Sequence, residues 1–121
     1  MRVLVCDDSA IVIRILYQVF TKEGHDTAVA TDGEEALELI VGKEEKFDLV
    51  VIDLNMPVIS GQKACEKIRQ LHPHLPIFAL TATQPKESLE ELKQLGFTGF
   101  CMKPINIEEI QQILKKYDVA S

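Results

Sequence analysis

Five short runs of β-branched and other apolar residues alternate with amphipathic helical patterns along the chain, and this alternation restricts the fold more than any other feature. Runs of this kind are typical of parallel strands that are buried on both faces of a sheet. Because crossovers between parallel strands are nearly always right-handed, five such units predict an α/β fold with a doubly wound sheet. We therefore expect a flavodoxin-like, five-stranded parallel sheet of order 2-1-3-4-5, with helices on both faces.

The boundaries of these elements follow from capping and turn residues. The predicted strands cover residues 2–6, 27–30, 48–52, 77–80 and 99–102. The first helix is expected to begin after Ser9, a good capping residue, and to end at Gly24. The other helical patterns cover residues 34–41, 63–71, 84–95 and 107–117, the last of them capped by Asn106.

Length, charge and cysteine content limit the class of protein. A chain of 121 residues, 46% of them hydrophobic, predicts one compact domain over residues 1–121. A formal charge of -6 and a pI near 5.0 argue against direct nucleic-acid binding, which needs Lys and Arg to neutralise phosphates. No apolar run resembles a signal peptide or a membrane span, so we expect a cytoplasmic protein. Cys6, Cys65 and Cys101 are widely spaced and are expected to be small buried hydrophobic residues.

Polar residues follow four of the five predicted strands. Asp7 and Asp8 come after the first strand, Asp53 after the third, Thr81 after the fourth and Lys103 after the fifth. The carboxyl ends of parallel strands share one edge, and ligands bind there where the strand order reverses, here between strands one and three. Taken singly, each residue is more often a cap or a solvated loop group. Together they predict a functional site.

The three carboxylates of this set, Asp7, Asp8 and Asp53, repel one another when they lie close together. Without a cation, the pKa of at least one of them should therefore be raised. Oxygen ligands without clustered His or Cys favour Mg²⁺, with Mn²⁺ as a second choice, over zinc. Mg²⁺ normally keeps several waters and shares its carboxylates with a phosphate, which leaves room for a phosphoryl group.

The same residues suggest a reaction. A carboxylate can attack phosphorus to form an aspartyl phosphate, and the protein then has to stabilise charge on the phosphoryl oxygens. We expect Asp53 to be the nucleophile. The expected donors to the phosphoryl group are the Lys103 ammonium, the Thr81 hydroxyl and the backbone N–H of Ala82.

These motifs and their spacing resemble the receiver domains of two-component response regulators, including the single-domain chemotaxis regulator. The resemblance spans nearly the whole chain. It rests on Asp7-Asp8, on Asp53-Leu54-Asn55-Met56-Pro57 followed by Gly61, on Thr81-Ala82, and on Lys103-Pro104.

The resemblance assigns a role to each site residue. It implies that Asp8 and Asp53 bind Mg²⁺ directly, and that Asn55 does so through its main-chain carbonyl. Asp7 would act mostly through water. Lys103 would pair with the acceptor carboxylate and then with the phosphoryl group.

The resemblance also implies a conformational switch. Thr81 would move toward the phosphoryl group, and Phe100 would move inward to fill the space vacated; a plain core role for Phe100 is the alternative. Many relatives carry Tyr at that position, so any contact made through its hydroxyl is absent here. The Lys103-Pro104 peptide bond is expected to be cis, and Thr83 and Asn55 would flank the phosphoryl group.

The partners implied are proteins. The phosphodonor would be a histidine kinase or a histidine phosphotransfer protein, whose helical bundle packs against the first helix and the loop after the fifth strand. A downstream protein or output domain would bind the face formed by residues 85–117, although the acidic side chains there also suit a solvated surface. The expected docking residues are Ile11, Ile13, Arg14, Pro104 and Ile105; for Ile11 and Ile13, membership of the core is the alternative.

Two other functions remain as alternatives. A phosphatase of the haloacid dehalogenase kind would share the Asp nucleophile, Mg²⁺, Lys and Thr, but that class needs a second acid where this chain has Asn55. A non-catalytic interaction module would not need all five polar residues. The interpretation adopted is a phosphoacceptor with self-catalysed phosphotransfer and dephosphorylation, not a metabolic enzyme. Met1 directly before the first strand favours a natural amino terminus, and a part of a larger regulator or hybrid kinase is the other possibility.

Overall fold

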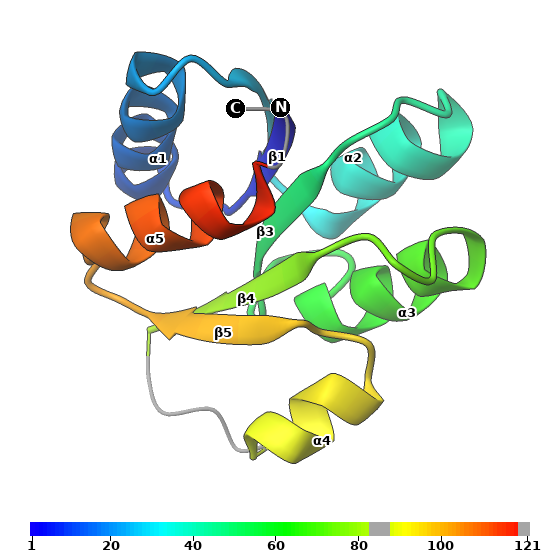
Figure 1. The fold of residues 1–121 in the computed structure, drawn as a ribbon. Coiled ribbons are helices and arrows are strands. Elements are labelled where there is room, and N and C mark those ends of the chain that lie inside the picture. The colour runs from blue at the N-terminus through cyan, green and yellow to red at the C-terminus, as the bar shows by residue number, and fades with distance from the viewer. Residues whose placement is uncertain (83–87, 119–121) are drawn as a thin grey trace.

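The computed structural model describes residues 1–82 and 88–118, and within them it shows one parallel sheet of five strands in the order β2-β1-β3-β4-β5. The predicted fold class and strand order are confirmed. Figure 1 shows the strands running through the middle of the molecule, with helices on both sides. The strands are β1 (Arg2–Cys6), β2 (Asp26–Ala30), β3 (Leu49–Asp53), β4 (Ile77–Thr81) and β5 (Gly99–Met102).

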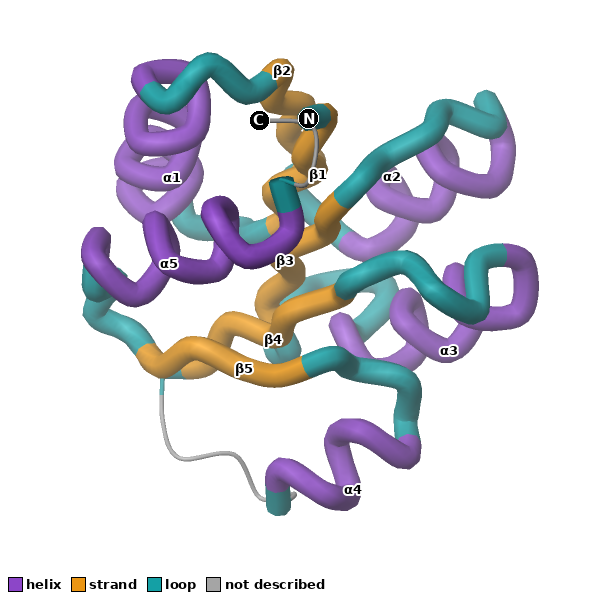
Figure 2. Tube along the Cα trace, viewed as in Figure 1, coloured by secondary structure: helices purple, strands orange, loops and turns teal. Residues whose placement is uncertain are grey.

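The helices form two layers. Helices α1 and α5 cover one face of the sheet, and α2, α3 and α4 cover the other (Figure 1). Figure 2 shows the same layers, with helices in purple, strands in orange and the described loops in teal. The helices are α1 (Ala10–Lys22), α2 (Gly33–Leu37) continued by the π-helix η1 (Glu38–Gly42), α3 (Gly61–Leu71), α4 (Leu89–Gln94) and α5 (Ile107–Tyr117).

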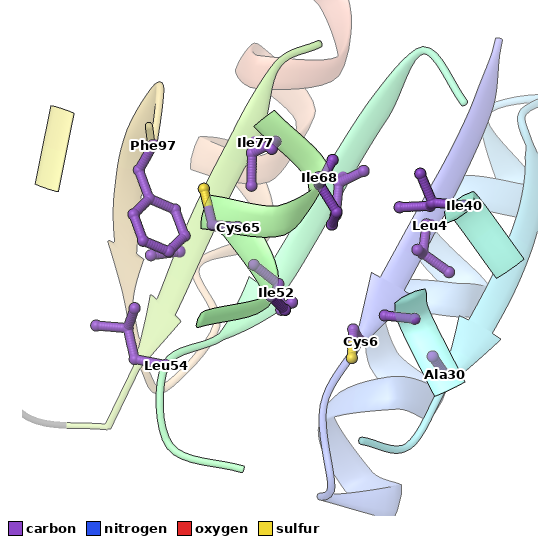
Figure 3. Packing of buried hydrophobic residues seen from close by; sticks show 14 of the residues in the cluster. Leu4, Cys6, Ala30, Ile40, Ile52, Leu54, Cys65, Ile68, Ile77 and Phe97 are labelled. Atoms are coloured by element: carbon purple, nitrogen blue, oxygen red, sulfur yellow. The ribbon is translucent and has the colours of Figure 1, made fainter. Parts of the chain in front are cut away.

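The sheet separates two hydrophobic clusters because successive side chains of a strand point to opposite faces. In β1, Leu4 packs toward α2 and α3, while Val3 packs toward α1 and α5. Figure 3 shows Leu4, Ile40, Ile52 and Ile68 in the cluster beneath α2 and α3. All three cysteines are buried, as predicted. This two-sided burial explains why the strands lack an alternation of apolar and polar residues.

Helix ends largely follow the predicted signals. The Ser9 side chain accepts a hydrogen bond from the Val12 N–H at the start of α1, and Asn106 caps α5 in the same way. Gly24 and Gly96 follow α1 and α4 with φ of 87° and 111°. Only glycine adopts that conformation without steric cost, so both positions suit a helix end.

Several boundaries differ from the predictions. Asp53 and Thr81 lie within β3 and β4, because each is paired in register with a residue of the next strand. The second helix ends in a π-helical turn, in which the Lys43 N–H donates to the Glu38 carbonyl at 2.7 Å. Helix α3 begins at Gly61, with Ser60 as its cap. Helix α4 is described from Leu89 onward, and the predicted start at residue 84 lies outside the described residues.

Within the described parts of the chain, no helix is long and apolar enough to cross a membrane.

Candidate phosphoacceptor site

The carboxyl ends of β1 and β3 bring three acidic side chains together. Asp7 and Asp8 directly follow β1, and Asp53 is the last residue of the neighbouring strand β3. One carboxylate oxygen from each of the three lies within 4.8 Å of the others. Asp7 and Asp53 are buried, whereas Asp8 is exposed. The predicted acidic cluster therefore exists, and it opens to solvent through Asp8.

Lys103 lies between the two buried acids. Its Nζ is 2.8 Å from Asp7 Oδ2 and 3.4 Å from Asp53 Oδ2. Burial alone would lower the pKa of Lys103, but the contact with Asp7 and the charges of Asp53 and Asp7 outweigh it and raise the pKa. The ammonium is therefore fully charged at neutral pH. The sequence predicted that Lys103 pairs with Asp53, but its ammonium lies closer to Asp7.

Asp53 has a strained electrostatic environment. Burial raises its pKa above the usual range, and the charge of Asp7 raises it further, while the Asn55 N–H and Lys103 act in the opposite direction. The Asn55 N–H donates to Asp53 Oδ1 at 3.2 Å. The predicted repulsion between carboxylates is thus found at Asp53. Its ionised form remains disfavoured even though Lys103 lies beside it.

Asp7 is oriented by its own loop. The Ser9 N–H donates to Asp7 Oδ1 at 2.8 Å, so Ser9 both caps α1 and holds this carboxylate. Asp7 Oδ2 is fully buried and, among the described residues, makes no hydrogen bond of good geometry; its polar contact is the ion pair with Lys103. A buried carboxylate oxygen in this state favours a nearby cation.

The donor set fits a hard divalent cation. The clustered ligands are carboxylate oxygens, and no histidine or cysteine joins them within the described residues. Mg²⁺ prefers such ligands and keeps part of its water shell, for which the exposed side of Asp8 leaves access. The residues present here are therefore suitable for Mg²⁺.

The predicted phosphoryl-binding residues Thr81 and Ala82 lie at the same edge, whereas the predicted switch residue Phe100 lies further inside the sheet, paired with Ala79. Thr81 is buried at the end of β4, and Ala82 after it is exposed. Phe100, in β5, is half-buried and packs against the cluster beneath α2, α3 and α4. The Lys103-Pro104 peptide bond is cis, as predicted. Thr83 lies outside the described residues.

The predicted docking residues fall into two groups. Ile11 is 73% exposed, and Arg14 and Pro104 are also exposed. Ile13 and Ile105 are half-buried and pack against the cluster under α1 and α5. The alternative of a core role therefore describes Ile13 better than Ile11.

Two glycines, Gly61 of the motif that follows Asp53 and Gly33, stand where a side chain would not fit. A Cβ at Gly61 would lie 2.2 Å from the Asp53 carbonyl oxygen, and one at Gly33 would lie 2.4 Å from the Ile59 carbonyl oxygen. The starts of α2 and α3 therefore pack against backbone at distances that no side chain permits. The sequence shows the glycines, but only the fold shows what they approach.

The chain matches the family model of the response regulator receiver domain over residues 3–115. The chain belongs to the receiver-domain family of response regulators. Receiver domains act as phosphoacceptors and signalling switches in two-component systems, and this function agrees with the acidic site and the lysine at its edge.

Known relatives support the assignment of this receiver domain. It is 30% identical over 116 residues to sporulation initiation phosphotransferase F of Bacillus subtilis, covering 96% of this chain and 92% of that protein. It is also 31% identical to the regulator PhoP of Bacillus subtilis, of which it spans 51%. It spans about half the length or less of several other relatives, including 7% of hybrid signal transduction histidine kinase I of Dictyostelium discoideum.

Solved structures give the same result for the fold. Chemotaxis protein CheY4 of Vibrio cholerae superimposes with a TM-score of 0.86 at 30% identity, covering 96% of this chain and 97% of that one. The CheX-CheY-BeF3-Mg²⁺ complex of Borrelia burgdorferi contains a chain that matches with a TM-score of 0.88 at 25% identity, covering 97% of this receiver domain and 89% of that chain.

Gly61 provides a test of how the receiver site is positioned. We expect Gly61→Ala to lower the free energy of unfolding by about 1–3 kcal/mol, because the new methyl group must displace the backbone of Asp53 and Leu54. Urea unfolding measures this change. Gly24→Ala is the matched control: nothing lies within 4 Å of its added Cβ, so only its φ of +87° opposes the change, at about 1 kcal/mol. An equal or smaller loss at Gly61 would contradict the proposed close approach.

Proposed function

We propose that Asp53 accepts a phosphoryl group from a phosphohistidine of a histidine kinase or histidine phosphotransfer protein. The observation that carries the proposal is the position of Asp53: it is 4% exposed, ends the strand next to β1, and shares Lys103 with Asp7. Burial and the charge of Asp7 raise the pKa of this carboxyl group, and carboxylates with a perturbed pKa at the edge of a sheet are candidates for nucleophiles.

In the transfer step, an Asp53 carboxylate oxygen forms a bond to phosphorus, and the bond between phosphorus and the donor imidazole nitrogen breaks. Lys103 supplies positive charge at Asp53 Oδ2 and is suited to follow the phosphoryl oxygens. The Thr81 hydroxyl and the Ala82 N–H, at the end of the adjacent strand β4, are the further donors that we assign to these oxygens.

We assign the Mg²⁺ site to Asp7, Asp8 and Asp53, together with the main-chain carbonyl of Asn55. When bound, Mg²⁺ would neutralise charge on the phosphoryl group during transfer. Mn²⁺ has similar ligand preferences and would serve in its place. The Borrelia burgdorferi CheY was solved with BeF3 and Mg²⁺, which supports this assignment for a receiver of the same fold.

The partner surfaces follow from the exposure of the predicted residues. Ile11, Arg14 and Pro104 are exposed beside the acidic site and would contact the phosphodonor, with Ile13 and Ile105 supporting them from the core. On the output side, Thr81 and Phe100 connect the site to the face formed by α4, β5 and α5. We propose that phosphorylation changes this face for a downstream protein or output domain in the cytoplasm.

The proposal is tested by labelling with acetyl phosphate and measuring intact mass. The chain has no tryptophan, so mass is a more direct readout than intrinsic fluorescence. We expect one phosphoryl adduct that requires Mg²⁺ and is absent from Asp53→Asn. Asp48→Asn, an acid at the opposite end of β3, is the control and should be labelled like the wild type. Labelling that persists in Asp53→Asn, or does not need Mg²⁺, would contradict the proposal.

A further inference from the structure

A surface groove of about 600 Å³ lies between α3 and the second helix, which consists of α2 and η1. The two helices lie side by side on one face of the sheet (Figure 1). Val41 and Leu71, which we call the apolar pair, line opposite walls and are 38% and 57% exposed. Leu37, on the second helix, also lines the groove and is partly buried. None of the residues of the acidic site lines this groove.

Opposite charges line the two walls. Glu34 and Glu38, which we call the acidic row, lie on the second helix, and Lys63 and Lys67, the basic row, lie on α3. All four are exposed. Glu66 also lies on α3 and lines the groove, so the α3 wall carries two positive charges and one negative charge against two negative charges on the other wall. Residues four apart share one side of a helix, so each row presents its two charges together. A Cβ at Gly42 would lie 3.1 Å from Glu38 Oε2, which shows that this glycine leaves space for the Glu38 carboxylate.

The two walls carry the same pattern along the same direction. Both helices follow strands of one parallel sheet, so both run the same way (Figure 1). Each wall begins with its charged row and ends with one member of the apolar pair. A two-fold rotation axis that runs parallel to the groove places the α3 wall of one copy against the second-helix wall of the other copy. The rotation leaves each residue at the same level along the groove. The acidic row of one copy then faces the basic row of the other, at both symmetric positions, and the apolar pairs meet.

We propose that this groove is a dimerisation surface, occupied by the same groove of a second copy of the chain. Charge complementarity selects this occupant, because the two walls carry opposite net charges even with Glu66 counted on the α3 wall. The acidic row and the basic row form no ion pair with each other within one chain, among the described residues. Lys63 instead pairs with Glu66 on its own helix at 3.8 Å. That exposed pair contributes little to stability, and Glu66 reduces the net positive charge of the α3 wall without reversing it.

The dimer should be weak and sensitive to salt. Parts of only two helices take part on each side, which is less than a standard interface of about 20–30 residues a side. We therefore expect a dissociation constant on the order of 100 µM. Exposed charges are screened within about 10 Å at 0.1 M salt, so association should weaken as the salt concentration rises.

Charge reversal tests the dimer by sedimentation velocity over a concentration series. Glu38→Lys and Lys67→Glu should each weaken self-association about tenfold, because each puts two like-charged pairs into the symmetric interface. An equimolar mixture of the two variants should form a heterodimer of about wild-type affinity, since the remaining charges then match. A variant that had merely lost its fold would not be rescued by mixing.

Three controls keep this result separate from the phosphoacceptor proposal. Glu108→Lys changes an exposed charge on α5, outside the groove, and should associate like the wild type. Asp53→Asn should also dimerise normally, and both groove variants should still be labelled by acetyl phosphate. A wild type that stays monomeric at 1 mM, roughly tenfold above the expected dissociation constant, would overturn the dimer, as would a mixture that associates no better than either variant alone.

Discussion

Lys103→Met is expected to destabilise the protein by about 3–5 kcal/mol at neutral pH, because it leaves the Asp7 carboxylate buried without a counter-ion. Asp7 is fully buried, and its Oδ2 lies 2.8 Å from the Lys103 ammonium. The raised pKa of Lys103 means that this stabilisation is fully present below pH 10.5 and is lost only as the pH rises through the folded-state pKa. The loss is a large part of the 5–15 kcal/mol that stabilises an ordinary domain. Urea unfolding at pH 7 measures it.

The mechanism is separated from a general packing defect by a double-mutant cycle. If the unpaired charge causes the loss, Asp7→Asn combined with Lys103→Met should be more stable than Lys103→Met alone. Lys93→Met, at an exposed position of α4, is the matched control and should change stability by less than about 0.5 kcal/mol. Additive losses in the cycle would show that the ion pair does not carry the effect. Labelling by acetyl phosphate should also fall, by about 100-fold, through loss of charge beside Asp53.

The sequence predicted the fold and the composition of the site because both depend on local patterns. Apolar runs on every strand indicate a sheet that is covered on both faces. The five polar residues of the site stand at the carboxyl ends of the predicted strands. The distances between the side chains of the site cannot be predicted from these local patterns. The closer approach of Lys103 to Asp7 than to Asp53 depends on side-chain packing at the edge, and no spacing in the sequence encodes it. The roles of Gly33 and Gly61 depend on which backbone segments meet after folding.

Boundaries were predicted less well than elements. The predicted strand ranges 48–52 and 77–80 stop one residue short of Asp53 and Thr81, which are the last residues of β3 and β4, because backbone pairing with the next strand continues past the last apolar residue. The π-helical turn of η1 was also missed. Its residues carry an ordinary helical pattern, and the wider turn is set by the hydrogen bond from Lys43 to Glu38.

Asp53→Asn is expected to stabilise the protein in the absence of divalent cations and to reduce its stabilisation by Mg²⁺. The folded-state pKa of Asp53 is raised by burial and by Asp7, so the folded state binds this proton more tightly than the unfolded state. Stability therefore falls as the pH rises from about 3.8 through the raised value, and the full penalty remains at neutral pH. Asparagine does not titrate, so the variant should melt higher than the wild type at pH 7, and this advantage should shrink toward pH 4.

When Mg²⁺ is present, the wild type should become more stable than Asp53→Asn. At a hundredfold excess over its dissociation constant, a ligand that binds only the folded state stabilises it by about 2.7 kcal/mol, or roughly 10 °C in melting temperature for a domain of this size. The wild type should show this increase, and Asp53→Asn should show a much smaller one. Asp26→Asn removes an acid with a 76% exposed side chain that pairs with Arg2 outside the site. This control should lose a little stability and keep the Mg²⁺ response. Equal Mg²⁺ stabilisation of wild type and Asp53→Asn would remove Asp53 from the metal site.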